Sequence, residues 1–83
     1  MKVTRSYLVT PYGEESVKIS VASDGVRLDD RLPDVLAECE RRGIAPEAWC
    51  KLSTVSRSGV VAPWTTVYLG SGEPGANPWG HYL

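Results

Sequence analysis

The 83-residue sequence lacks phenylalanine and has one histidine, His81, and two cysteines, Cys39 and Cys50. A single histidine argues against a histidine-based metal centre, and two cysteines fit neither a zinc-ligand spacing nor a disulfide framework. No apolar run approaches the roughly 20 residues that span a membrane, and no signal-peptide pattern opens the chain. We therefore expect no metal, no cofactor and no membrane insertion, and we expect a reduced, cytoplasmic protein.

The sequence also lacks an excess of charge of either sign. It has nine Lys and Arg and ten Asp and Glu, for a net charge of −1. Such a chain lacks the clustered basic field that draws in nucleic acid, so nucleic acid is not expected as the direct partner. The sequence has one Asn, two Ile, and six Arg against three Lys. The scarce residues use AT-rich codons, which indicates a GC-rich gene of bacterial or phage origin.

Two predicted strands, at residues 3–10 and 16–22, form the first half of the expected sheet. The second is marked by the strict apolar–polar alternation in "SVKISVA". The residues between them, "TPYGEE", are typical of a turn. The following "SDGV" predicts a two-residue type I′ turn into a short third strand, which would place Val26 and Leu28 on the same buried face. We therefore expect a three-stranded β-meander.

One main helix is predicted over "DDRLPDVLAECERRGI". Its apolar stripe, which should face the sheet, consists of Leu32, Val35, Leu36 and Cys39. Asp29 or Asp30 is the expected N-cap, with Pro33 in the first turn, and Gly43 should end the helix in a left-handed conformation.

A second hairpin is predicted from "CKLSTVS" and "VVAPWTTVYLG", with Gly59 at the left-handed position of its turn. Pro63 should bend the later strand or place it at a sheet edge. Before this hairpin, "APEAW" indicates one helical turn beginning at Pro46. The sequence thus predicts an α+β fold, in which the helix packs on one face of an antiparallel sheet of about four to five strands. Residues 1–70 would form a single domain, and 71–83 an irregular Gly/Pro-rich aromatic tail packed on it.

The glycines after the last predicted strand, Gly70, Gly72 and Gly75, have the spacing of a dinucleotide-binding fingerprint. That site also needs a helix N-terminus directed at the pyrophosphate and a second β–α unit. Here Pro74 and the remaining "ANPWGHYL" discourage a helix, and no acidic residue follows to bind a ribose. We interpret the glycines as an irregular exit from the strand.

Other catalytic patterns are also incomplete. The acidic residues that open the predicted helix lack the spacing of an EF-hand and are explained by helix capping; they are Asp29, Asp30 and Asp34. A cysteine–histidine dyad would need His81, two residues from the end of the chain, beside Cys39 or Cys50. Cys39 falls on the apolar stripe, where a packed, inert thiol is expected. No G-x-S-x-G elbow is present, so we do not expect an enzyme.

Two functions remain. The favoured one is a non-enzymatic protein-binding module that docks on a larger bacterial complex and inhibits or regulates it. Small GC-rich genes of phages and mobile elements often encode such inhibitors, for example of CRISPR effectors, and the analogy is one of size and composition. The expected contact residues, in the aromatic tail, at the tip of the second hairpin and on the acidic helix face, are Trp79, His81, Tyr82, Arg57, Asp34, Glu38 and Arg41.

The alternative is a nucleic-acid-associated accessory domain that uses the uncovered sheet face. This face would carry Arg5, Tyr7, Lys18, Lys51 and Arg57. The tail also has two interpretations, because Trp79 could fold back over the sheet or contact a partner directly. Both a monomer and a homodimer joined at a sheet edge are compatible with the sequence.

Overall fold

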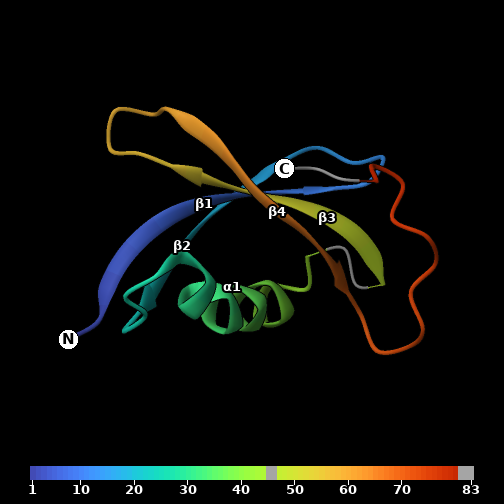
Figure 1. Ribbon diagram of the computed structural model, residues 1–83, viewed down its shortest axis with the longest axis horizontal. Coiled ribbons are helices and arrows are strands. Elements are labelled where there is room, and N and C mark those ends of the chain that lie inside the picture. The colour runs from blue at the N-terminus through green and yellow to red at the C-terminus, as the bar shows by residue number, and fades with distance from the viewer. Residues whose placement is uncertain (45–46, 81–83) are drawn as a thin grey trace.

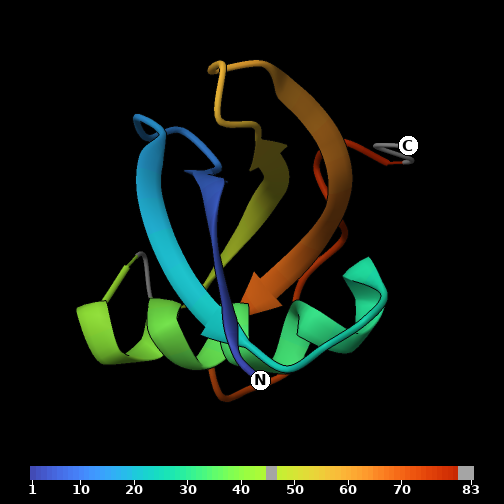
Figure 2. The ribbon, with the colours of Figure 1, turned by 90° about the vertical axis from the view of Figure 1, so that its left-hand side faces the viewer.

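A computed structural model describes residues 1–44 and 47–80 and confirms the α+β class. The elements of this described part are β1 (Val3–Pro11), β2 (Val17–Ser23), α1 (Leu28–Arg42), β3 (Ala48–Val55) and β4 (Val61–Leu69). Its strands form one antiparallel sheet in the order β2-β1-β3-β4, and α1 lies against one face of this sheet (Figure 1 and Figure 2).

The hydrophobic core lies between this sheet face and α1. The alternation predicted for β2 is confirmed, since Ile19 and Val21 are buried while their neighbours are exposed. The helix stripe is confirmed too, because Val35 and Cys39 are buried and the two leucines of the stripe pack against them. The buried hydrophobic residues are Tyr7, Val9, Ile19, Val21, Val35, Cys39, Cys50, Leu52, Trp64 and Leu69.

The two ends of α1 differ in how well the sequence predicts them. Gly43 adopts the expected left-handed conformation, with φ 65°, and the Ile44 N–H donates to the Cys39 carbonyl over 3.0 Å. At the other end the helix begins earlier than predicted, at Leu28. Asp30 is therefore not the N-cap but the third helical residue, whose carboxylate accepts the Arg27 N–H at 3.2 Å. Pro33 consequently lies in the second turn rather than the first.

The predicted third strand is wrong. Val26 is 95 % exposed instead of buried, and Leu28 already begins α1. Two sets of contacts direct the chain from β2 straight into α1. The Gly25 N–H donates to the Ser23 hydroxyl at 3.0 Å, and the Arg31 guanidinium donates to the carbonyls of Ser23 and Gly25. A side chain at position 25 would bring its Cβ within 2.7 Å of the Arg31 Cγ, so glycine allows this close approach.

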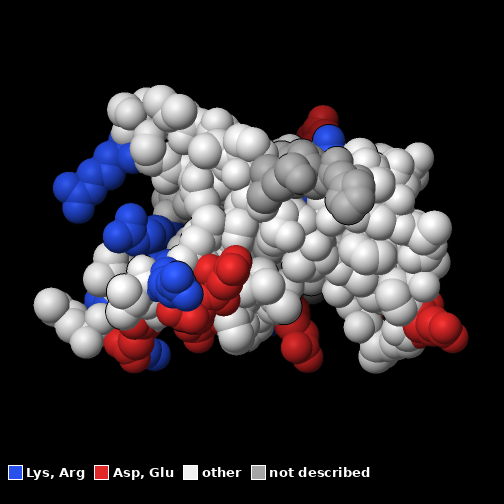
Figure 3. Space-filling model, in the orientation of Figure 1, with Lys and Arg blue, Asp and Glu red and all other residues white. Residues whose placement is uncertain are grey.

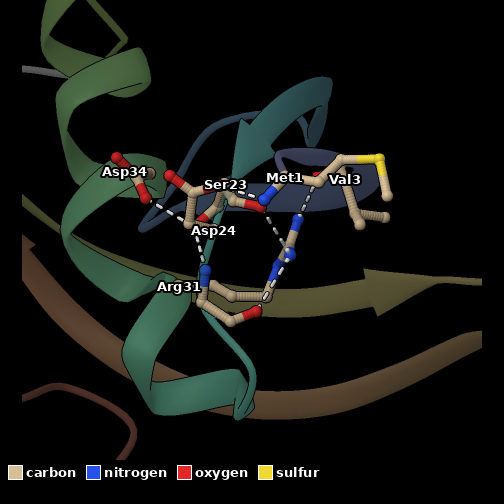
Figure 4. Close-up of polar contacts among 7 residues, drawn as sticks. Met1, Val3, Ser23, Asp24, Arg31 and Asp34 are labelled. Atoms are coloured by element: carbon tan, nitrogen blue, oxygen red, sulfur yellow. Dashed lines mark hydrogen bonds and ion pairs between the residues drawn. The ribbon is translucent and has the colours of Figure 1, made fainter.

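Arg31 is a buried cation that the sequence analysis did not identify. Its side chain is 3 % exposed; Nε donates to the Tyr7 hydroxyl over 2.5 Å and Nη2 to the Val3 carbonyl over 2.8 Å. Longer bonds of 3.4 Å reach the carbonyls of Val21, Ser23 and Gly25. Within residues 1–44 and 47–80, no carboxylate oxygen lies within 4.0 Å of its guanidinium. Figure 4 shows the side chain extending from α1 to the start of β1 and the end of β2.

The β3–β4 hairpin forms as predicted. Gly59 has a φ of 87°, its N–H donates to the Ser56 carbonyl over 2.9 Å, and the Ser56 N–H donates to the Val60 carbonyl over 2.9 Å. β4 is an edge strand, and its register with β3 shifts beside Pro63, as expected for a residue without an N–H. The predicted helical turn is not found at its described end, because β3 begins at Ala48; its start at Pro46 lies outside the described residues.

Replacing Tyr7 with phenylalanine should lower the free energy of unfolding by about 1–3 kcal/mol, because a buried guanidinium N–H would lose its hydroxyl acceptor. Urea unfolding followed by circular dichroism measures this change. The matched control is Tyr12→Phe, which removes a hydroxyl from a 58 % exposed side chain and should stay within about 0.5 kcal/mol of the parent. Equal stability of the two variants would contradict the structural role assigned to the Tyr7–Arg31 bond.

Candidate functional site

The β3–β4 hairpin diverges from the N-terminal end of β1 (Figure 1). A cleft of about 620 Å³ lies between residues of these two segments. Pairing between β1 and β3 begins at Ser6 and Val55, whereas β1 continues to pair with β2 back to Val3. The hairpin tip and the N-terminal end of β1 therefore form two walls. The lining includes residues 3–7 of β1, residues 54–57 and Val60 of the hairpin, and Val26, Leu28 and Arg31. We refer to this feature as the arginine cleft.

The charge of the arginine cleft has one sign. Arg5, Arg31 and Arg57 line it, and no Asp or Glu is among the described lining residues. Arg5 and Arg57 are exposed, whereas Arg31 contributes a buried charge at the inner end. Figure 3 shows Lys and Arg side chains on both sides of the gap between the hairpin and the N-terminal end of the sheet, with Asp and Glu side chains beside those on the α1 side. Positive charges around a concave surface produce a local potential that favours an anionic group, even though the whole chain has a net charge of −1.

The arginine cleft also exposes large apolar side chains. Val3, Val26, Leu28 and Val60 line it, and each is among the exposed large hydrophobic residues of the described chain. They come from β1, from the connection between β2 and α1, from the first residue of α1 and from the hairpin. An apolar patch bordered by arginines is typical of a surface that contacts another macromolecule.

The contact residues predicted from the sequence lie on separate surfaces. Arg57 is at the tip of the β3–β4 hairpin and lines the arginine cleft. Three others lie on α1, namely Asp34, Glu38 and Arg41. Trp79 is on the opposite face of the sheet from α1, and His81 and Tyr82 lie outside the described residues. The structure therefore brings Arg57 together with Arg5 and Arg31, and not with Asp34, Glu38, Arg41 or Trp79.

The two acidic residues of α1 that were predicted to contact a partner, Asp34 and Glu38, have partners within the chain. The Glu38 carboxylate accepts hydrogen bonds from Arg41 Nη2 over 2.5 Å and from Arg42 Nε over 2.7 Å. These two arginines lower the pKa of Glu38 to about 2. The Asp34 carboxylate accepts the hydroxyl proton of Ser23 over 2.5 Å, which links α1 to the end of β2. Both carboxylates therefore contribute to intramolecular contacts around the helix.

The tail lies against the sheet face opposite α1. The Trp79 ring stands edge-on to Tyr12 with 5.3 Å between centroids, and the Lys51 ammonium is 4.9 Å from the Trp79 centroid. Trp49 Nε1 donates to the Gly75 carbonyl over 2.9 Å. Of the two interpretations of the tail, these contacts correspond to the one in which Trp79 folds back over the sheet. Trp79 remains partly exposed, so part of its ring is also accessible to a partner.

The basic and aromatic residues proposed for a nucleic-acid surface do not share one face, and this part of the prediction is wrong. Tyr7 is buried beneath α1, and the alternation along β1 places Arg5 on that same face. Lys18 and Lys51 pair with Leu8 and Thr10 of β1, which point to the opposite face. Odd and even positions of a strand point in opposite directions, so the sheet register separates the set.

Neither thiol is set up as a nucleophile. Cys39 and Cys50 are both buried, and burial raises both pKa values, that of Cys50 to about 11. A thiol with a raised pKa is protonated near neutral pH, where a nucleophile must be a thiolate. In the described part of the chain, no group of three or more His, Cys, Asp or Glu side chains comes together to hold a metal ion. No helix within it has the length and apolar character needed to cross a membrane.

The Glu38 ion pairs should make the protein sensitive to acid. Because the folded-state pKa of Glu38 is about 2 and its ordinary value is 4.5, its stabilising contribution is present above pH 4.5 and is lost as the pH falls toward 2. Glu38→Gln should therefore show a smaller fall in Tm between about pH 5 and about pH 2 than the parent. Glu40→Gln, which removes an exposed carboxylate of the same helix, is the control. An unchanged fall in Glu38→Gln would contradict the assignment.

Comparison of the chain with protein-family models, curated proteins and solved structures gives no match. The candidate site is therefore defined by the geometry of this chain, in which three arginines and several exposed apolar side chains surround one cleft.

Proposed function

We propose that this protein is a small, non-enzymatic protein-binding module that docks on a larger bacterial complex through the arginine cleft and inhibits or regulates that complex. The observation that carries this proposal is the combination of exposed arginines and exposed apolar side chains in a cleft without an acidic lining residue. The scarcity of residues with AT-rich codons indicates a GC-rich gene, which supports a phage or mobile element as its source.

Arginine and apolar side chains act together in protein interfaces. Burying the exposed side chains of Val26, Leu28 and Val60 against a partner would remove apolar surface from water, which drives association. Arginine is enriched among the residues that dominate binding energy, because its planar guanidinium makes directed bonds while its stem covers apolar surface. Arg57, at a hairpin tip, can adjust its position to a partner, since its side chain is exposed.

The alternative partner, nucleic acid, has less support. Single-stranded nucleic acid is held by aromatic rings on which bases stack. The only aromatic side chain among the described residues of the arginine cleft is Tyr7, and it is buried. Trp49, Tyr68 and Trp79 lie on the other face of the sheet. There Trp49 contacts Tyr68 and the Gly75 carbonyl, and Trp79 contacts Tyr12 and Lys51. The chemistry of the arginine cleft therefore favours a protein.

Replacing Arg57 with glutamate should weaken capture of the binding partner. The full-length chain, carrying an affinity tag, would be incubated with lysate of a GC-rich bacterium, and captured proteins would be identified by mass spectrometry. Arg57→Glu should reduce the captured partner about tenfold, because one attractive charge in the arginine cleft becomes repulsive. Lys18→Glu makes the same charge change on the opposite face and should retain the partner.

Two other outcomes would assign the function differently. Loss of the partner in Trp79→Ala, with retention in Arg57→Glu, would make the tail the interface and contradict the proposed site. Recovery of nucleic acid instead of protein, with binding that falls steeply as salt rises, would favour the accessory-domain alternative. Thermal melting of each variant establishes that the loss of a partner is not caused by unfolding.

A further inference from the structure

The arginine cleft contains an unpaired strand edge. Residues 3–5 of β1 pair with β2 on one side, but the pairing of β1 with β3 begins only at Ser6 and Val55. In an antiparallel sheet, successive residues direct their N–H and C=O groups to alternate sides. The Tyr12 N–H donates to the Trp49 carbonyl in this register, so even-numbered residues of β1 face β3. Among residues 3–5, Thr4 therefore directs its N–H and C=O toward the gap that β3 leaves as it turns into the hairpin. An edge of this kind can pair with an added strand.

The charges around this edge favour carboxylates. Arg5 lies on the edge itself and Arg57 on the opposite wall, and both side chains are exposed. At the inner end, the described contacts of Arg31 are carbonyl and hydroxyl oxygens, and none of them is a carboxylate. A guanidinium binds a carboxylate through two parallel hydrogen bonds, which gives both strength and orientation.

Apolar side chains also lie around the edge, together with Thr4, Ser6, Thr54 and Ser56. Val26 and Leu28 approach from the start of α1, and Val60 approaches from the hairpin. Arg5, Arg31, Val26 and Leu28 all lie on the α1 side of the sheet, so side chains at every second position of an added strand would meet both the arginines and the apolar residues. The arrangement matches a segment in which acidic and apolar residues share one face.

We propose that the arginine cleft binds an extended acidic segment of a partner protein, which pairs with residues 3–5 of β1 and directs its carboxylates toward Arg5 and Arg57. This inference rests on the proposed function and specifies the chemistry of the partner. A single-stranded nucleic acid would need exposed aromatic rings on which its bases stack, and the only aromatic side chain among the described lining residues, Tyr7, is buried.

Selection from a library of random octapeptides against the full-length chain tests the inference. We expect enrichment of peptides in which Asp or Glu and apolar residues stand two positions apart, so that both share one face of the strand. The most enriched peptide, carrying a fluorophore, should bind about tenfold more weakly when its acidic residues are replaced with Asn and Gln. Arg5→Glu and Arg57→Glu should each weaken binding by a similar factor, and the matched control Lys18→Glu should leave it unchanged. Selected peptides without acidic residues, or binding unaffected by both arginine variants, would overturn the inference.

A backbone measurement separates strand addition from simple charge attraction. Hydrogen exchange followed by NMR should show slower exchange within residues 3–5 when the peptide is bound, and unchanged exchange at Trp79. Binding without slower exchange within residues 3–5 would overturn the strand pairing. Stronger competition by a single-stranded oligonucleotide than by unlabelled peptide would assign the arginine cleft to nucleic acid.

The failures of the two proposals can be distinguished. If the lysate partner requires Arg57 but the selected peptides carry no acidic residues, the protein-binding function stands and the acidic strand is wrong. If acidic peptides bind as expected but Arg57→Glu still captures every lysate partner, the chemistry of the arginine cleft stands and its role in docking on that complex is wrong.

Discussion

The guanidinium of Arg31 joins the parts of this fold that meet at the N-terminal end of the helix. A cation inside a protein is costly unless oxygen atoms replace the water that it loses. Here one hydroxyl and four backbone carbonyls take that place, and they belong to both β1 and β2 and to the connection that follows. These oxygen atoms compensate the guanidinium for its lost water. Because they belong to β1, β2 and the connection into α1, the same bonds fix where α1 begins.

This arrangement explains why the chain does not form a third strand after β2. The Gly25 carbonyl and N–H both have partners, the first in Arg31 and the second in the Ser23 hydroxyl, which in turn donates to Asp34 of α1. Gly25 is therefore bonded to Arg31 of α1 and to the side chain of the last residue of β2, and not by the backbone pairs of a hairpin. The first turn of α1 is held against the ends of β1 and β2, while the β3–β4 hairpin diverges from them and leaves the arginine cleft between.

The two faces of the sheet have different characters as a result. On the face opposite α1, the tail contacts the sheet through Trp79 and the Gly75 carbonyl, so aromatic residues there already have neighbours in the chain. On the helix side, α1 covers the core but Val26 and Val60 remain exposed around the arginine cleft. Apolar and cationic groups that no described segment covers are available to a partner, and this is why we place function at the cleft.

By itself, the sequence determined the elements whose residues act locally. Alternation marked β2, the apolar stripe marked α1, and Gly43 and Gly59 marked the turns, because each depends on a few neighbouring residues. Tertiary structure alone decided the rest. Arg31 stands four residues before Val35, on the buried stripe, but only the carbonyls of distant strands show why a cation is tolerated there. Likewise, Arg5 and Arg57 are far apart in the chain, and the strand order β2-β1-β3-β4, set by long-range pairing, brings them to one cleft.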